Sequence, residues 1–109
     1  MGNIEMKRFF VIWSLALFTL ITHAKDVVID VRTPEEYAEG HLPGALNMSY
    51  ESIAQKIAKT KIKKDDRVIL YCRSGRRSGL ALETLKGLGF SKAENAGGME
   101  EASKLLNSP

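Results

Sequence analysis

Two short, nearly continuous apolar runs constrain the fold of this chain more than any other feature. They are residues 27–31 (VVIDV) and residues 67–72 (RVILYC). Apolar side chains at consecutive rather than alternate positions are typical of strands that are buried on both faces. We therefore expect both segments to be interior strands of a sheet that is covered on each side.

The segments between the strands carry helix signals. Thr33 is placed to cap a helix, Pro34 to occupy its first position and Glu36 to complete a capping box. This short helix should end before Gly40. Apolar residues at helical spacing predict a second helix over residues 50–59, with a buried face formed by Ile53, Ala54, Ile57 and Ala58.

The second half of the chain continues the alternation. A helix is expected from residue 77 or 78 to residue 88, with Leu80, Ala81, Leu85 and Leu88 as its buried stripe. Further strands are expected over residues 45–48 and 90–95, then a turn at Gly97 and Gly98 and a last helix over residues 99–106. This order predicts an α/β fold with a central parallel sheet of about four to five strands and helices on both faces.

The N-terminus has the composition of a signal peptide. Lys7 and Arg8 precede an uncharged run over residues 9–21, and Ala24 is a small residue suited to cleavage. The run is shorter than the roughly 20 residues of a membrane span. We expect a signal peptide over residues 1–24 and one exported, periplasmic domain over residues 25–109, with no stable membrane span after cleavage. An uncleaved N-terminal anchor is the alternative.

Charge and cysteine content narrow the function. The net charge of +3 falls to +2 when Glu5, Lys7 and Arg8 leave with the signal peptide, and no aromatic residues interleave with the basic ones. These features argue against nucleic-acid binding. The chain holds a single cysteine, Cys72, which therefore has no disulfide partner within the chain.

The loop after Cys72 predicts a reactive thiolate. Cys72 ends the second apolar run, and ligands of parallel sheets bind beyond the carboxyl ends of the strands. Backbone N–H groups can converge on an anion at such a strand-to-helix loop, and Gly75 permits the backbone geometry that this needs. Fixed positive charge nearby also lowers a thiol pKa. The candidate site is Cys72 with Arg73, Ser74, Gly75, Arg76 and Arg77.

Four segments together resemble the motifs of rhodanese-like domains. The Cys72 loop reads YCRSGRRS, and the first strand is followed by DVR and PEEY. The strings GHLPGA, from Gly40, and ENAGGM, from Glu94, match the family's second and closing motifs. Many relatives carry a tryptophan shortly after the double glycine, where this chain has Glu100, Glu101 and Ala102.

The resemblance implies a thiosulfate sulfurtransferase that needs no cofactor and no metal. Cys72 would take the outer sulfur of thiosulfate as a persulfide and pass it to cyanide, a thiol or a protein. Backbone N–H groups of residues 73–77 would cradle the sulfur, and Arg73 and Arg76 would hold the sulfonate. Asp30 and Arg32 are second-tier candidates, equally consistent with a structural ion pair. His41 lies in a turn motif and is expected to be structural.

Two other functions fit parts of the sequence. Phosphatases and arsenate reductases also use a cysteine in an anion-binding loop, but in their C-x₅-R pattern the arginine would replace Ser78. The arginine of this chain is Arg77, one residue earlier, which favours sulfur over phosphate. A non-catalytic or sulfur-relay binding module is the second alternative, and the presence of Cys72 argues against its non-catalytic form.

Overall fold

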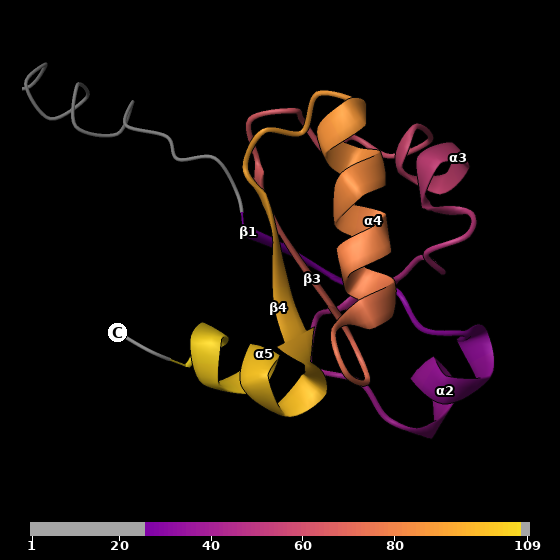
Figure 1. The fold of residues 1–109 in the computed structure, drawn as a ribbon. Coiled ribbons are helices and arrows are strands. Elements are labelled where there is room, and N and C mark those ends of the chain that lie inside the picture. Colours follow the sequence, from indigo (N-terminus) through magenta and orange to yellow (C-terminus); the bar gives the residue numbers. More distant parts are fainter. Residues whose placement is uncertain (1–25, 108–109) are drawn as a thin grey trace, which may run out of the picture.

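The computed structural model describes residues 26–107, which form a four-stranded parallel sheet and the helices that cover it (Figure 1). The strand order is β2-β1-β3-β4. The predicted signal peptide lies outside the described residues. Along the chain the elements are β1 (Asp26–Asp30), α2 (Pro34–Glu39), β2 (Leu46–Asn47), α3 (Ile53–Ile57), β3 (Arg67–Cys72), α4 (Arg76–Gly87), β4 (Ala93–Gly98) and α5 (Met99–Leu106).

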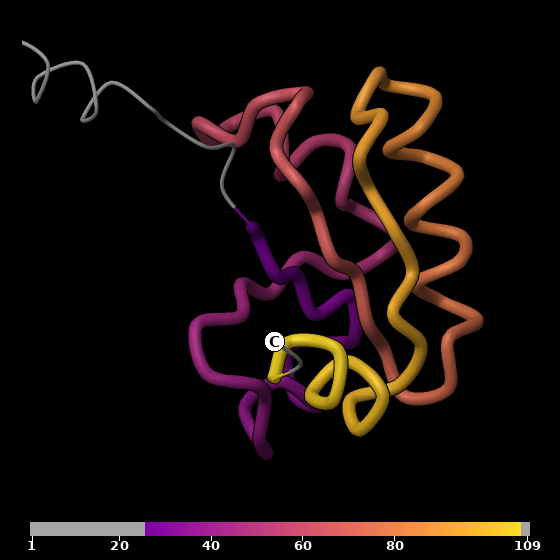
Figure 2. Tube along the Cα trace, turned by 90° about the vertical axis from the view of Figure 1, so that its left-hand side faces the viewer, coloured from indigo at the N-terminus to yellow at the C-terminus, as the bar shows by residue number. Residues whose placement is uncertain are grey.

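Helices cover both faces of the sheet, which confirms the predicted fold class. One core cluster joins β1 and β3 to α3 and α4, through side chains such as Leu70 and Leu85. The other contains Tyr71 of β3 and Ala102 of α5. Figure 2 shows β4 lying between α4 and α5. Consecutive residues of β3 therefore point into different cores, which explains why the run is apolar throughout.

The start of α2 forms as its sequence predicts. The Thr33 hydroxyl accepts a hydrogen bond from the Glu36 N–H at 3.1 Å, and the Glu36 carboxylate accepts one from the Thr33 N–H at 3.0 Å. This reciprocal pair satisfies two backbone donors that a helix start would otherwise leave open. It also fixes the Glu36 carboxylate at the carboxyl end of the sheet.

The buried stripe of α4 differs from the prediction. Ala81 and Leu85 are fully buried as expected, but Leu80 is 40% exposed and Leu88 is 41% exposed. The third buried residue is Ser78. Residues 78, 81 and 85 share one helical face, and this face is polar where it reaches the Cys72 loop. The prediction that Leu80 and Leu88 are buried was therefore wrong. It relied on hydrophobicity, whereas the buried face of this helix includes a serine.

Other boundaries also shift. The last strand runs over Ala93–Gly98 rather than residues 90–95, so Gly97 and Gly98 belong to the strand end and not to a separate turn. The helix predicted over residues 50–59 is limited to Ile53–Ile57. The register between β3 and β4 is irregular after Leu70, and Cys72 pairs with Gly98. This places the start of α5 beside the Cys72 loop.

Candidate active site

Cys72 lies at the carboxyl end of β3, where the chain turns into α4. Cys72 is 1% exposed, and the Gly75 N–H donates a hydrogen bond to its sulfur at 2.9 Å. Gly75 is the N-cap of α4 and has φ +99°, a left-handed conformation that favours glycine. The sulfur therefore sits at the N-terminus of a twelve-residue helix, where anions are stabilised.

The surroundings of Cys72 favour its thiolate. Burial raises the pKa of the thiol, but hydrogen bonds from the Ser78 hydroxyl and from backbone N–H groups outweigh this effect. The backbone donors belong to Ser78, Gly75 and Ser74, and the net result is a lowered pKa. A thiolate is the nucleophilic form of cysteine, so the loop prepares Cys72 for attack on an electrophilic atom.

A second layer of hydrogen bonds supports the loop from β4. Asn95 donates from Nδ2 to the Gly75 carbonyl at 2.9 Å, and its Oδ1 accepts from the Gly97 N–H at 2.8 Å. The Ser78 hydroxyl lies 2.6 Å from the same Oδ1 and 3.4 Å from the Cys72 sulfur. The sulfur is thereby linked to β4 through α4.

Glu36 connects α2 to the arginines of the loop. Its carboxylate pairs with the Arg77 guanidinium through contacts of 2.8 Å and 3.1 Å, and the Arg73 guanidinium lies 3.5 Å away. The hydrogen bonds from the Arg77 guanidinium, and then those from Thr33, hold the pKa of Glu36 well below its ordinary value. The Arg77 side chain is thus engaged in bracing the loop, while Arg73 is 70% exposed and extends over the opening.

Asp30 and Arg32 form a buried ion pair at the end of β1. The closest contact joins Arg32 Nη2 to Asp30 Oδ2 at 2.7 Å, and Arg32 also donates to the Gly40 carbonyl at 2.7 Å. Tyr71 lies beneath, with its ring 5.9 Å from the guanidinium carbon. Burial raises the pKa of Tyr71 to about 12, so this hydroxyl stays protonated. The pair anchors the floor of the site.

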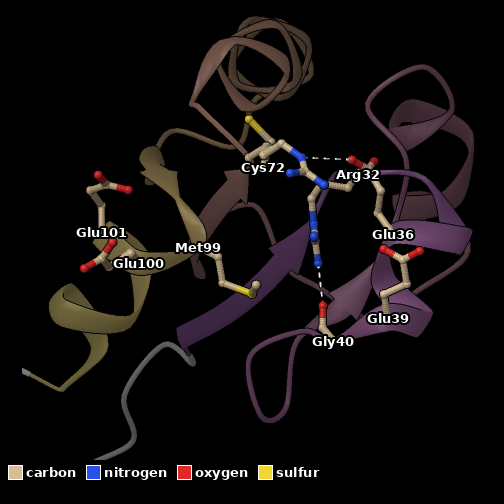
Figure 3. Close-up of a pocket in the computed structure, with 9 residues that line it drawn as sticks. Arg32, Glu36, Glu39, Gly40, Cys72, Met99, Glu100 and Glu101 are labelled. Carbon is tan, nitrogen blue, oxygen red and sulfur yellow. Dashed lines mark hydrogen bonds and ion pairs between the residues drawn. The ribbon is translucent and has the colours of Figure 1, made fainter.

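Cys72, Arg32, Glu36 and Arg73 are among the residues that line an open cavity of about 450 Å³. Figure 3 shows Arg32, Glu36 and Glu39 on one side of the cysteine and residues of α5 on the other. The α5 residues are Met99, Glu100 and Glu101. The lining includes Arg32 and Arg73 but not Arg76, which is exposed elsewhere on the surface. Four carboxylates therefore face two guanidinium groups around the opening.

The acidic part of this lining was not predicted from the sequence. Glu36 was identified as a helix cap, but its contact with Arg77 spans 41 positions. Glu39 and Glu100 give no local signal, because exposed carboxylates occur on most helices. The closing ENAGGM motif was the available clue to Asn95 and Met99. His41, which was expected to be structural, stacks on the Tyr37 ring and contacts the Tyr37 carbonyl at 2.8 Å.

Residues 26–107 contain no group of three or more His, Cys, Asp and Glu side chains arranged to hold a metal ion. Within the same range, no helix has the length and apolar character required to cross a membrane.

Comparison with known proteins gives one consistent result. A family model described as "Rhodanese-like domain" matches residues 17–104. The chain is 42% identical over 89 residues to the thiosulfate sulfurtransferase PspE of Escherichia coli K12, and the match covers 81% of this chain and 86% of that protein. It is 37% identical over 86 residues to a sulfurtransferase of Allochromatium vinosum, covering 78% of each.

A solved structure of rhodanese with anions from E. coli has the same fold. It superposes with a TM-score of 0.66 and is 41% identical in sequence, and the match covers 70% of this chain and 89% of that one. The fold of this chain is therefore shared with an experimentally determined structure.

Proposed function

Since the chain belongs to the rhodanese-like family of sulfurtransferases, we propose that it transfers the outer sulfur of thiosulfate to a thiophilic acceptor through a persulfide on Cys72. One observation carries this proposal. The only cysteine of the chain lies at the base of an open cavity, with its sulfur held by the Gly75 N–H at 2.9 Å. The similarity to PspE, which is named a thiosulfate sulfurtransferase, supports the choice of donor.

The first half-reaction loads the enzyme. The Cys72 thiolate attacks the outer sulfur of thiosulfate and forms a new S–S bond. The bond between the two sulfur atoms of thiosulfate breaks, and sulfite leaves with the electron pair. The negative charge then rests on the outer sulfur of the persulfide, where the N–H groups at the start of α4 can stabilise it.

The second half-reaction returns the enzyme to its starting state. A nucleophile such as cyanide, a thiol or a protein thiolate attacks the outer sulfur. The S–S bond of the persulfide breaks, and its electron pair returns to Cys72 as a thiolate. No net redox change falls on the enzyme, and the proposed cycle uses no cofactor and no metal.

The residues of the Cys72 loop have different roles in the proposed reaction. Ser74 and Gly75 supply backbone donors to the sulfur, and Arg73 is placed at the opening to meet the sulfonate of the donor. Arg77 holds the loop against α2 through Glu36. Arg76 was expected to bind the sulfonate as well, but its position outside the cavity lining favours Arg73 for this role. Arg32 lines the cavity, and the buried ion pair with Asp30 holds its guanidinium in place.

We propose export to the periplasm on the composition of the N-terminus. Lys7, Arg8 and the uncharged residues 9–21 form the pattern of a secretion signal. N-terminal sequencing of the protein from a periplasmic fraction tests this assignment. A new N-terminus at Lys25 supports cleavage after Ala24, and a retained Met1 in the membrane fraction supports an anchor.

A steady-state assay tests the proposed activity. Thiosulfate and cyanide should yield thiocyanate and sulfite, with the parallel double-reciprocal lines of a ping-pong mechanism. Cys72→Ala should abolish the reaction. Hydrolysis of an aryl phosphate in place of thiocyanate formation would indicate the phosphatase alternative, and absence of both activities would indicate a binding module.

A further inference from the structure

The Ser78 hydroxyl lies close to the reacting sulfur but has no role in the two half-reactions of the proposed cycle. Ser78 is fully buried on the inner face of α4, directly behind the reacting sulfur. Its oxygen lies within hydrogen-bonding distance of three acceptors: Asn95 Oδ1 at 2.6 Å, the Gly75 carbonyl at 3.2 Å and the Cys72 sulfur at 3.4 Å. A hydroxyl has one proton to donate, so these three acceptors compete for it.

Two of the three acceptors do not depend on this proton. The Gly75 carbonyl already accepts from the Gly79 N–H at 3.0 Å and from Asn95 Nδ2 at 2.9 Å. Asn95 Oδ1 already accepts from the Gly97 N–H at 2.8 Å. The proton can therefore turn to the sulfur without leaving a buried acceptor unsatisfied, which would otherwise be costly.

The orientation of Asn95 is fixed by the backbone. Its Nδ2 faces a carbonyl and its Oδ1 faces an N–H group, so exchanging the two atoms would set donor against donor and acceptor against acceptor. Asn95 consequently always presents an oxygen to Ser78. When the Cys72 sulfur carries no charge, this amide oxygen is the strongest remaining acceptor for the hydroxyl.

The charge on the Cys72 sulfur changes during the proposed cycle. It is an anion in the attacking thiolate and a neutral, two-bonded sulfur in the persulfide, whose charge rests on the outer atom. We propose that Ser78 is a further catalytic residue, whose hydroxyl proton turns from Asn95 Oδ1 to the Cys72 sulfur as the persulfide bond breaks, and that Asn95 is the positioning residue that holds this proton in the loaded enzyme. This inference rests on the proposed function.

The proposed turn has a directional consequence. In the release step the S–S electron pair moves onto Cys72, and a hydrogen bond from Ser78 makes that thiolate a better leaving group. In the loading step the same hydrogen bond makes the thiolate less nucleophilic. Loss of the hydroxyl should therefore slow sulfur release while leaving loading unchanged or faster, once pH is high enough to ionise Cys72.

The first arm of the test measures the ionisation of Cys72. Because the chain has one cysteine, the pH dependence of iodoacetamide alkylation reports on Cys72 alone. Ser78→Ala should raise the alkylation pKa by about one unit, the size expected for a lost hydrogen bond to a charged group. Ser78→Thr retains a hydroxyl and should stay near the wild type. Thr84→Ala removes a hydroxyl from a partly exposed position of the same helix, away from Cys72, and should have no effect.

Charged groups on every element around Cys72 stay in place in these variants, so the comparison isolates the hydroxyl. They are Arg32, Glu36, Glu39, Arg73, Arg77, Glu100 and Glu101. Circular dichroism and the midpoint of thermal unfolding establish that Ser78→Ala folds. An unchanged alkylation pKa in a folded Ser78→Ala protein would overturn the inference, whether or not the wild type transfers sulfur.

The second arm measures the two half-reactions separately. The pH is set above the alkylation pKa of Cys72 in both the wild type and Ser78→Ala. Loading is followed as sulfite release from thiosulfate, and release as thiocyanate formation from the isolated persulfide and cyanide. Ser78→Ala should slow release by about three- to tenfold and leave loading unchanged or up to about threefold faster. Equal slowing of both steps would indicate a structural role and contradict the inference. A wild type that never loads sulfur would instead refute the proposed function.

Discussion

The carboxylate of Glu36 and the guanidinium of Arg77 are joined by contacts of 2.8 Å and 3.1 Å, although 41 positions separate them in the sequence. Glu36 also caps α2 through Thr33. One side chain thus ties the start of α2 to the start of α4, on either side of the Cys72 loop. Both partners are about one-fifth exposed, which limits how far solvent weakens the pair.

Glu36→Gln should destabilise the protein in a pH-dependent way. Glutamine preserves the capping interaction with Thr33 but removes the charge that pairs with Arg77. Because the folded-state pKa of Glu36 is lowered, its contribution is present above the ordinary carboxyl pKa of 4.5 and is lost as pH falls below it. Chemical unfolding should show a deficit of about 1 kcal/mol at pH 7 that shrinks below pH 4.5.

Glu35→Gln serves as the control for this measurement, since Glu35 lies next in sequence in the same first turn but is exposed. It should change the unfolding free energy little at either pH. A Glu36→Gln deficit of the same size at pH 7 and at pH 3 would contradict an ionic role for the contact with Arg77.

Arg73 and Arg76 should differ in their effect on thiosulfate binding. Arg73 lines the cavity and Arg76 does not, although both follow Cys72 closely in the sequence. Arg73→Ala should raise KM for thiosulfate by about tenfold or more, as expected for loss of a charge-assisted contact, while Arg76→Ala stays within about twofold. Initial-rate measurements with varied thiosulfate test this. A larger effect of Arg76→Ala than of Arg73→Ala would indicate that Arg76 binds the sulfonate of thiosulfate.

Glu39→Gln should improve the use of an anionic donor. Glu39 lines the opening, where four carboxylates face two guanidinium groups, so it repels thiosulfate. We expect KM for thiosulfate to fall by about two- to fivefold at low salt, and the difference from wild type to diminish as salt screens exposed charges. Glu51→Gln removes an exposed carboxylate from outside the cavity and should leave KM unchanged. An identical KM for Glu39→Gln at low salt would show that the rim does not affect the donor.

Gly98→Ala should damage the loop through a steric clash. A Cβ on Gly98 would overlap the Arg73 carbonyl and lie 2.8 Å from Glu101 Oε1. We expect a loss of about 1–3 kcal/mol in unfolding free energy, together with reduced activity. Gly87→Ala meets nothing within 4 Å and should be neutral or stabilising by up to about 1 kcal/mol. Equal stability of the two variants would mean that the loop yields to an added methyl group.

Local patterns were sufficient to predict much of this structure. The apolar run ending at Cys72 gave the central strand and the position of the sulfur at its carboxyl end. The Thr33 and Glu36 capping box formed as predicted, because both partners lie within four residues. Such features depend on interactions between residues that are close in the sequence, so local sequence patterns are enough to predict them.

Other features depend on contacts between distant segments and were not predicted. The pairing of Glu36 with Arg77 arises only when α2 and the Cys72 loop meet at one edge of the sheet. Ser78 was treated as a loop-length marker, and its link to Asn95 depends on how β4 packs beside α4. Leu80 was expected to be buried, but the inner face of α4 carries Ser78 instead.

The central claim is that Cys72 carries sulfur as a persulfide, and intact-protein mass spectrometry tests it most directly. The purified, reduced protein is incubated with thiosulfate, freed of excess donor and weighed beside Cys72→Ala treated in the same way. The wild type should gain the mass of one sulfur atom and lose it again on addition of cyanide. The variant should gain no mass. A wild-type mass that does not change with thiosulfate would contradict the account.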